Sequence, residues 1–395
     1  MKAKDPLHIL YINHSSHVSG AEKCLNDLIS HLDIDYFRSF YICPARGTFF
    51  RLFNAKANHV AFLPLPILRN TLNPLYWIFY FIQWVSNAFR VYSVIKKKRI
   101  DLIHANSLSA GMHSFLAAKR AKIKQIIHVR DIVTGRGGWI ASRLLYIAAD
   151  KIICVSQAVY DHYALENPKL AEKMCVVYDG MNHDAHVKRG SVGGINDVLS
   201  RYKNDILIGN IGQMIPLKGQ IVLLNAILRL KEYYAYENLK FLFIGGTLDV
   251  TFHQSVSYQR RLERFIDEHG LTHDVIIIKD FVSDMSPIYN ALHILVQPSI
   301  RPDSFPHTIL EAFYHHVPVV ASRIGGIPEQ IQHGKTGLLF SPGSVHELAE
   351  NIHWLLINPA LKSDITQNAY ALVNSRFSID NHIQTITNLY RKLCR

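Results

Sequence analysis

Two carboxylates eight positions apart, Asp303 and Glu311, lie in the stretch QPSIRPDSFPHTILEA that begins at residue 297. The apolar run 291–296 before them predicts a buried parallel strand, and helix-compatible residues follow them. Glu311 is expected roughly one turn into that helix, where its carboxylate can accept hydrogen bonds from sugar hydroxyls. A strand, a loop and an acidic residue in this order predict a nucleotide-binding site.

The same stretch predicts a seat for phosphate at the start of the helix. Pro306 is expected in the first turn, where a missing N–H costs little. The free N–H groups of His307 and Thr308 then lie at the positive end of the helix dipole.

A lysine in a glycine-bounded loop offers a positive charge for the same phosphate. Lys218 and Gly219 follow the predicted strand 206–211, and a helix with Leu223 and Ile227 on its apolar face comes next. A lysine ammonium is a point charge suited to phosphate. The alternative is a solvated surface lysine.

Polar residues also stand just beyond predicted strands in the first half of the chain. Gly20 precedes a helix from 21 to about 32, and His104 and His128 end two strands, at the edge where open α/β sheets bind ligands. A turn glycine and structural histidines are the plain alternatives. Arg130 and Asp131 either position an acceptor or pair with each other.

The elements that must position these residues alternate between short apolar runs and helical segments, which predicts two mainly parallel sheets. The glycine-rich stretch 187–194 predicts a linker, with a domain boundary near residue 190. We therefore expect domains at 1–190 and 191–375, with a helix at 376–395 that crosses back to the first domain. The predicted strands are 8–12, 38–42, 60–63, 100–104, 126–129, 152–155, 175–178, 206–211, 241–246, 275–278, 291–296 and 317–321.

The spacing of Asp303 and Glu311 resembles the paired glutamates of retaining GT-B glycosyltransferases of family 4. Pro298-Ser299 before the pair and Glu311-Ala312 with 318–321 after it match that family's pattern. The sequence departs from the pattern at four positions. Asp303 replaces glutamate, Pro306 and Ser19 stand where glycine is common, and Gln213 replaces arginine, for which Arg301 is a candidate substitute.

The resemblance implies an α/β GT-B fold, with two Rossmann-like domains facing a cleft. It also implies metal-independent, retaining transfer of a sugar from a nucleotide diphosphate sugar, without a cofactor. Lys218 and helix amides would hold the diphosphate, Glu311 the ribose and Asp303 the sugar. The implied catalytic residues are His128, Lys218, Asp303 and Glu311, and the implied donor-binding residues are Gly20, Gln213, Lys218, Arg301, Phe305, His307, Thr308 and Glu311. The family's base-binding position corresponds to Phe281-Val282.

Composition restricts the other possibilities. The chain has 395 residues, of which 49% are hydrophobic and 19% charged, as in a globular protein with full cores. Five scattered cysteines indicate a reducing compartment, and no signal peptide is visible. Although there are 22 histidines, none falls in a metal-binding pattern, and Asp33-Ile34-Asp35 follows a helix rather than a strand.

The net charge of +12 calls for an anionic partner. No nucleic-acid recognition motif is present, so we expect an anionic membrane surface instead. Segment 75–99 is aromatic, carries one narrow polar stripe and ends in KKKR, as interfacial helices do. A packed domain helix and a membrane span are its alternatives.

These expectations place a peripheral enzyme on the cytoplasmic face of the cell membrane. Its acceptor would be a saccharide, lipid-linked or of the cell envelope. The alternatives are a degenerate GT-B membrane-associated binding subunit, suggested by the departures at Ser19, Gln213 and Asp303, and a GT-B epimerase or phosphorylase.

Overall fold

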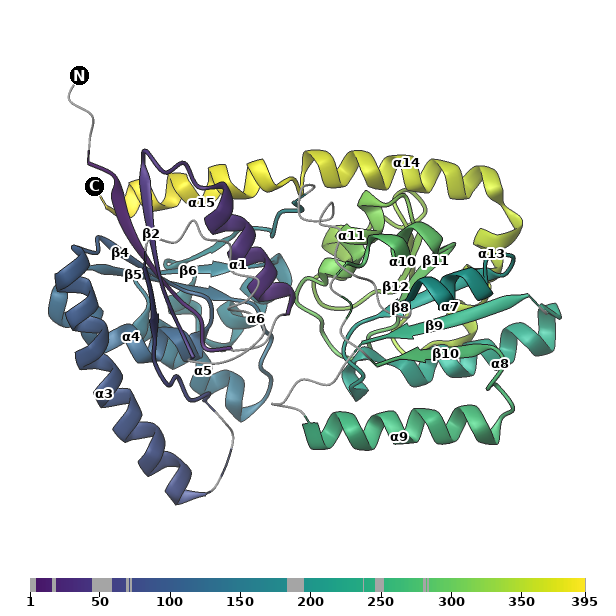
Figure 1. Ribbon diagram of the computed structural model, residues 1–395, viewed down its shortest axis with the longest axis horizontal. Coiled ribbons are helices and arrows are strands. Elements are labelled where there is room, and N and C mark those ends of the chain that lie inside the picture. The colour runs from purple at the N-terminus through teal and green to yellow at the C-terminus, as the bar shows by residue number, and fades with distance from the viewer. Residues whose placement is uncertain are drawn as a thin grey trace. The chain divides into compact units, whose positions relative to one another are not determined.

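The computed structural model describes residues 5–15, 19–44, 59–68, 71, 73–182, 195–236, 238–245, 252–279, 282 and 284–394. The chain forms two compact units (Figure 1). Unit 1 comprises Met1–Gly180 together with Ile379–Arg395, and unit 2 comprises Met181–Ser378.

Unit 1 is built on a seven-stranded sheet in the order β3-β2-β1-β4-β5-β6-β7, in which all neighbours are parallel. The strands are rich in isoleucine and largely buried, as strands covered on both faces must be. They are β1 (Leu7–Ile12), β2 (Phe37–Cys43), β3 (His59–Phe62), β4 (Leu102–Ala105), β5 (Lys124–Val129), β6 (Lys151–Cys154) and β7 (Met174–Val176).

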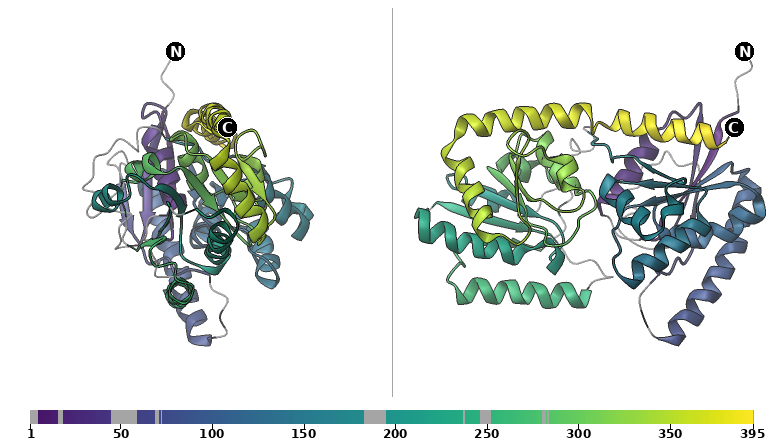
Figure 2. Two further views of the ribbon diagram at one scale, coloured as in Figure 1. Left: turned by 90° about the vertical axis from the view of Figure 1, so that its right-hand side faces the viewer. Right: turned by 180° about the vertical axis from the view of Figure 1, so that it is seen from behind.

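Helices cover both faces of this sheet. Helices α1 and α15 pack together on one face, whereas α3, α4 and α5 follow one another on the other (Figures 1 and 2). Leu25 of α1 and Ile386 and Tyr390 of α15 join Ile9 and Tyr11 of β1 in one buried cluster. The helices of unit 1 are α1 (Gly20–His31), α3 (Pro74–Lys98), α4 (Leu108–Ala121), α5 (Arg136–Ala148), α6 (Gln157–Glu166) and α15 (Ile379–Leu393), with a short 3₁₀ turn at Pro168–Leu170.

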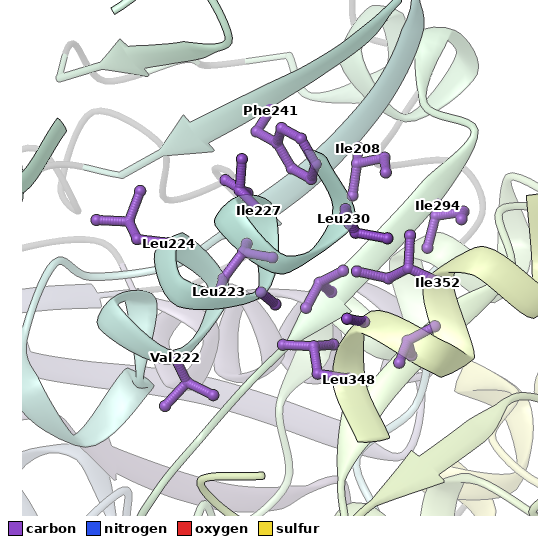
Figure 3. Close-up of a cluster of buried hydrophobic side chains, with 14 of the residues drawn as sticks. Ile208, Val222, Leu223, Leu224, Ile227, Leu230, Phe241, Ile294, Leu348 and Ile352 are labelled. Carbon is purple, nitrogen blue, oxygen red and sulfur yellow. The ribbon is translucent and has the colours of Figure 1, made fainter. Parts of the chain in front are cut away.

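Unit 2 repeats the architecture with six parallel strands in the order β10-β9-β8-β11-β12-β13. Figure 3 shows its main core, where Leu223 and Ile227 of α8 meet Leu348 and Ile352 of α13. The strands are β8 (Ile206–Ile211), β9 (Leu239–Ile244), β10 (Val275–Ile278), β11 (Ile294–Gln297), β12 (Val319–Ser322) and β13 (Leu338–Phe340). The helices are α7 (Ile195–Arg201), η3 (Pro216–Lys218), α8 (Gln220–Tyr234), α9 (Phe252–Glu268), α10 (Ser286–Ala291), α11 (His307–Tyr314), α12 (Ile327–Gln330), α13 (Val345–Ile357) and α14 (Pro359–Ser375).

The boundary between the units differs from the expected one near residue 190. It lies at Gly180–Met181, because the N–H of Met181 donates to the carbonyl of Phe377 at 2.8 Å and ties this residue to unit 2. The expected linker 187–194 lies outside the described residues, as does Phe281.

The helix expected at 376–395 corresponds to α15, which belongs to unit 1, whereas α14 before it belongs to unit 2. Strand β13 was missed, because its three residues are too short for a periodic pattern.

In helix α3, a residue of the polar stripe is buried and several apolar residues are exposed. Asn87, from the predicted polar stripe, is fully buried and donates to the carbonyl of Pro64 at 2.6 Å. Ile78, Phe81 and Phe89 are instead exposed, and the N-terminal half of the helix extends beyond α4 (Figures 1 and 2). Among the helices within the described ranges, none has the length and apolar character needed to cross a bilayer. The membrane-span alternative for this segment was therefore wrong.

Candidate functional site

In unit 2, loops that follow parallel strands meet around Asp303. Lys218 comes from the loop after β8, and its Nζ lies 2.5 Å from Oδ2 of Asp303. The Nε2 of Gln297, at the end of β11, and the Oγ of Ser299 each lie 3.4 Å from the same oxygen. The ion pair is largely enclosed, since the Lys218 and Asp303 side chains are 20% and 12% exposed. Two of the four predicted catalytic residues, Lys218 and Asp303, are therefore in direct contact.

Two glycines allow these loops to approach so closely. Gly219 has a φ of +70°, and a Cβ there would lie 1.9 Å from the carbonyl oxygen of Pro298. Gly325 has a φ of +59°, and a Cβ there would lie 2.2 Å from the carbonyl oxygen of Asp303. Because L-residues with a side chain rarely adopt such backbone angles, both positions require glycine.

Glu311 lies on the buried side of α11. Its Oε2 accepts a hydrogen bond from the hydroxyl of Tyr289, on α10, at 2.6 Å. Burial and then the Glu311 charge raise the pKa of Tyr289 well above its usual value, so the phenol remains a donor. Tyr289 thus fixes the orientation of the carboxylate.

Helix α11, whose start is the predicted phosphate-binding position, begins one residue later than expected. Pro306 is the N-cap residue rather than part of the first turn, and the helix begins at His307. The Oγ1 of Thr308 is buried and has no hydrogen-bond partner within the described part of the chain. A buried hydroxyl without such a partner at the start of a helix suits an anionic ligand.

The three other predicted donor-binding residues of unit 2 differ in their surroundings. The carbonyl of Gln213 accepts from Nε2 of Gln220 at 3.0 Å, which holds the loop that carries Lys218. Arg301 is exposed near Asp303 in the chain. Phe305 is buried, and its ring meets that of Phe377 edge-on, so the phenylalanine side chain packs in the core of unit 2.

In unit 1, polar side chains that follow four strands form a connected network. Nδ2 of Asn106 donates to Oδ1 of Asn13 at 3.1 Å, and Nε of Arg130 donates to Oδ1 of Asn106 at 3.0 Å. A guanidinium nitrogen of Arg130 lies 2.5 Å from Oδ2 of Asp179. Asp179 is therefore a charged partner of Arg130 that the sequence did not indicate, and the two alternatives for Arg130 and Asp131, positioning an acceptor or pairing with each other, stay predictions.

The network reaches the start of α1, where Gly20 is the first helical residue. Nδ2 of Asn106 lies 3.3 Å from the carbonyl oxygen of Ala21. Before Gly20, the N–H of Ser19 donates to Oε2 of Glu22 at 3.0 Å, and the serine hydroxyl donates to the same carboxylate. Serine therefore caps α1, a role that the glycine usual at this position of the family cannot fulfil with a side chain.

His128 belongs to the same network and is held through His104. Nε2 of His104 lies 3.3 Å from Nδ1 of His128, and Nδ1 of His104 lies 2.5 Å from the hydroxyl of Tyr390. A guanidinium nitrogen of Arg130 lies 3.4 Å from Nδ1 of His128. Because a guanidinium can only donate, Nδ1 of His128 is an acceptor and its Nε2 carries the proton.

That Nε2 is buried and has no hydrogen-bond partner among the described residues. His128 is 1% exposed, and burial followed by the charge of Arg130 lowers its pKa well below the usual value. His128 is therefore a neutral donor of one N–H. Such a group can hold an oxygen of a ligand.

Acid should destabilise unit 1 through these two histidines. Burial, then the charges of Arg130 and His382, lowers the pKa of His104 to about 3. Between that value and about 6.5, the unfolded chain binds a proton that the native state does not bind, so stability falls as the pH falls. We expect the free energy of unfolding to decrease below about pH 6.5, by up to about 1.4 kcal/mol per pH unit for each histidine.

Urea unfolding of the whole chain at a series of pH values measures this dependence. His104→Gln combined with His128→Gln should flatten it, whereas His346→Gln, at a histidine that is 59% exposed, should not. An unchanged slope in the double variant would contradict the assignment of buried neutral histidines.

Sequence reasoning missed several residues of these clusters. Asp179 and Tyr390 hold Arg130 and His104, and Tyr289 holds Glu311. Tyr390 is 286 residues from His104, and no local pattern indicates such a contact. Position after a strand was the usable signal, and it applies to Asp179, which follows β7.

Comparisons with known proteins agree with this architecture. A family model for group 1 glycosyl transferases matches residues 195–372, and a model for glycosyltransferase family 4 matches residues 18–185. An uncharacterised glycosyltransferase of Methanocaldococcus jannaschii is 24% identical over 321 residues, which cover 79% of this chain and 81% of that protein. A capsular polysaccharide biosynthesis glycosyltransferase of Staphylococcus aureus is 24% identical over 263 residues, 64% of each chain.

Among solved structures, HepE of Anabaena in complex with UDP-glucose superposes with a TM-score of 0.81. It is 23% identical, and the alignment covers 98% of this chain and all of that one. This likeness confirms the expected α/β GT-B fold. Because the two family models together match most of the chain, one mainly in each unit, the protein belongs to the group 1 glycosyltransferases.

Proposed function

We propose that this protein transfers a sugar from a nucleotide diphosphate sugar to a hydroxyl group, with retention of anomeric configuration and without a metal. The observation that carries the proposal is the Lys218–Asp303 ion pair, formed between loops that follow β8 and β11 at the carboxyl edge of the unit 2 sheet. This edge is where open α/β sheets bind nucleotides. UDP-glucose in the complex of HepE supports a donor of this class.

In the proposed reaction, the bond between the sugar and the diphosphate breaks as the bond to the acceptor oxygen forms. Negative charge develops on the departing diphosphate, and the acceptor proton passes to it. Lys218 has three N–H donors, so its ammonium can keep Asp303 and also donate to phosphate. The N–H groups of His307 and Thr308 add fixed dipoles at the same charge.

The carboxylates and His128 then bind the sugar parts of the donor. Glu311, oriented by Tyr289, accepts from ribose hydroxyls, and Asp303 contacts the transferred sugar. His128 donates its Nε2–H to a sugar oxygen rather than acting as a base, because its other nitrogen already accepts. Gly20, at the start of α1, lets the diphosphate approach the backbone.

Thermal shift with a panel of UDP, GDP and ADP sugars tests the donor class, because a ligand that binds the native state raises the melting temperature. We expect one nucleotide series to stabilise the protein. Glu311→Ala should weaken that binding by about tenfold to a hundredfold, the effect of losing hydrogen bonds to a charged group. Glu350→Ala, at a carboxylate that is 51% exposed on α13, is the matched control and should change nothing.

Release of nucleoside diphosphate from the stabilising donor then separates the alternatives. Binding without turnover, in the presence of a panel of saccharide acceptors, would favour the degenerate binding subunit. Conversion of the donor to an epimer would favour the epimerase, and sugar 1-phosphate formation the phosphorylase. If no nucleotide sugar binds, the donor assignment fails.

We further propose a lipid-linked or cell-envelope saccharide as acceptor, used on the cytoplasmic face of a membrane. The capsular glycosyltransferase of Staphylococcus aureus supports this class of acceptor. Segment 75–99 would contact anionic lipid through α3, whose exposed side is apolar and whose end carries Lys96, Lys97 and Lys98. The proposed contact places the protein on the membrane surface rather than through it.

A further inference from the structure

Helix α5 has an outer face that is unusual for a protein surface. Trp139, Ile140 and Ile147 are 50%, 50% and 56% exposed. Arg136 and Arg143 of the same helix are also exposed. Spacings of three and four residues place all five on one side of the helix. The opposite side, with Leu145 and Ala148, is buried in unit 1. A surface helix normally turns polar residues outward, whereas this one exposes apolar residues and arginines.

The tryptophan and one arginine of this face are already in contact. The guanidinium carbon of Arg143 lies 4.1 Å from the centre of the Trp139 ring. Tryptophan favours the membrane–water interface, where its ring lies at the level of the headgroups. An arginine stacked on it keeps its N–H groups free for lipid phosphates.

The charge on α5 and on the two helices that precede it, α3 and α4, has one sign. Helix α4 lies between α3 and α5 and packs on both (Figure 1). None of the three helices contains an aspartate or a glutamate. Their basic residues are Arg90, Lys96, Lys97, Lys98, Lys119, Arg120, Arg136 and Arg143. More than half of the exposed large apolar side chains within the described residues also lie on these helices.

We propose that the outer face of α5 is a second membrane-docking helix, which binds anionic phospholipid with Arg136 and Arg143 while Trp139, Ile140 and Ile147 enter the headgroup boundary. The inference rests on the proposed membrane contact of α3 and extends it to a separate element. Charge complementarity favours anionic lipid over a second copy of the chain, because two such basic faces repel each other. Two docking helices also restrict rotation about α3, so the protein would bind the membrane in one orientation.

Tryptophan fluorescence can test α5 separately from α3. The chain has four tryptophans, Trp77, Trp84, Trp139 and Trp354, and variants that keep only one of them report on one element each. The vesicles contain equal amounts of phosphatidylcholine and phosphatidylglycerol, with and without brominated acyl chains. We expect the protein with only Trp139 to show a blue-shifted emission and quenching by brominated lipid, and the protein with only Trp354, on α13, to show neither.

Binding of the full chain to the same vesicles gives the magnitude. Trp139→Ser combined with Ile140→Ser should lower the partition coefficient more than about tenfold, because two apolar side chains lose their burial. Arg143→Gln should lower it about fivefold, and only when anionic lipid is present. Trp354→Ser combined with Ile357→Ser is the matched control, since these residues of α13 are 45% and 56% exposed.

The possible failures are distinguishable. If Trp77 is quenched and Trp139 is not, the α3 contact stands and the α5 inference is overturned. If neither is quenched, the membrane part of the proposed function fails as well, whereas donor binding in solution is unaffected. A dimer in sedimentation without vesicles, dissociated by Trp139→Ser with Ile140→Ser, would show that a second copy covers this face and would also overturn the inference.

Discussion

Replacing Lys218 with methionine should reduce sugar transfer by about a hundredfold to a thousandfold. The expected size follows from removing one charge aimed at the departing diphosphate, by analogy with the loss of an oxyanion-hole donor. The loss should fall mainly on kcat, because the negative charge grows as the bond breaks. Steady-state kinetics with the donor identified by thermal shift measures it.

Two further variants test whether the loss of transfer is due to the charge and the position of Lys218. Lys218→Arg keeps the charge but changes its geometry, so it should retain more transfer than methionine does. Lys335→Met removes an exposed lysine of the same unit and should leave kcat unchanged. Equal kcat in Lys218→Met and wild type would refute the phosphate role and leave the lysine as a structural partner of Asp303.

Replacing Arg130 with methionine should lower the free energy of unfolding by about 3–5 kcal/mol, because it leaves a carboxylate buried without its cation. The Arg130 and Asp179 side chains are only 10% and 3% exposed. Burial alone would lower the pKa of Arg130, but Asp179 raises it, so the guanidinium stays charged. Urea unfolding at neutral pH measures the loss.

A surface ion pair of the same unit supplies the comparison. Lys124 pairs with Asp150 at 3.1 Å and is 56% exposed, so Lys124→Met should cost only about 0–1 kcal/mol. A similar small loss in Arg130→Met would mean that water reaches Asp179 and that the network around His128 is not closed.

The alternation of apolar runs with helical segments was enough to predict both sheets. The structure has a strand at each predicted position, with ends that differ by a few residues. Short runs of β-branched residues between turn residues are typical of buried parallel strands. The same reasoning singled out Lys218 and Asp303, which follow strands, and His128, which lies near the end of β5. Topology places such residues at one edge of a sheet whatever their partners are.

The partners themselves could not be predicted. Lys218 was assigned to phosphate and Asp303 to sugar, but the structure pairs them across 85 positions of sequence. For Arg130, the sequence offered an acceptor contact or a pair with Asp131, and it did not indicate the contact with Asp179, 49 residues away. Side-chain pairing depends on which strands are adjacent, and a single sequence does not order them.

Which side of α3 and of α5 faces outward could not be predicted from the sequence either. In α3, periodicity showed a polar stripe but not which way it faces, and Asn87 of that stripe is buried. In α5, the sequence alone does not separate the apolar residues that cover the sheet from those that face outward. Only a structure shows that Trp139 and Ile140 lie outside.

The return of α15 to unit 1 has a consequence for the order in which the protein can be made. Unit 1 needs Ile386 and Tyr390 for its core, although these residues are synthesised after the whole of unit 2. Unit 2 is continuous in sequence and can finish folding first, while the first 180 residues wait for their final helix. A premature stop after residue 378 would therefore spare unit 2 and leave the sheet of unit 1 without α15 on one of its faces. When expressed alone, residues 181–378 should therefore fold, whereas residues 1–180 should not.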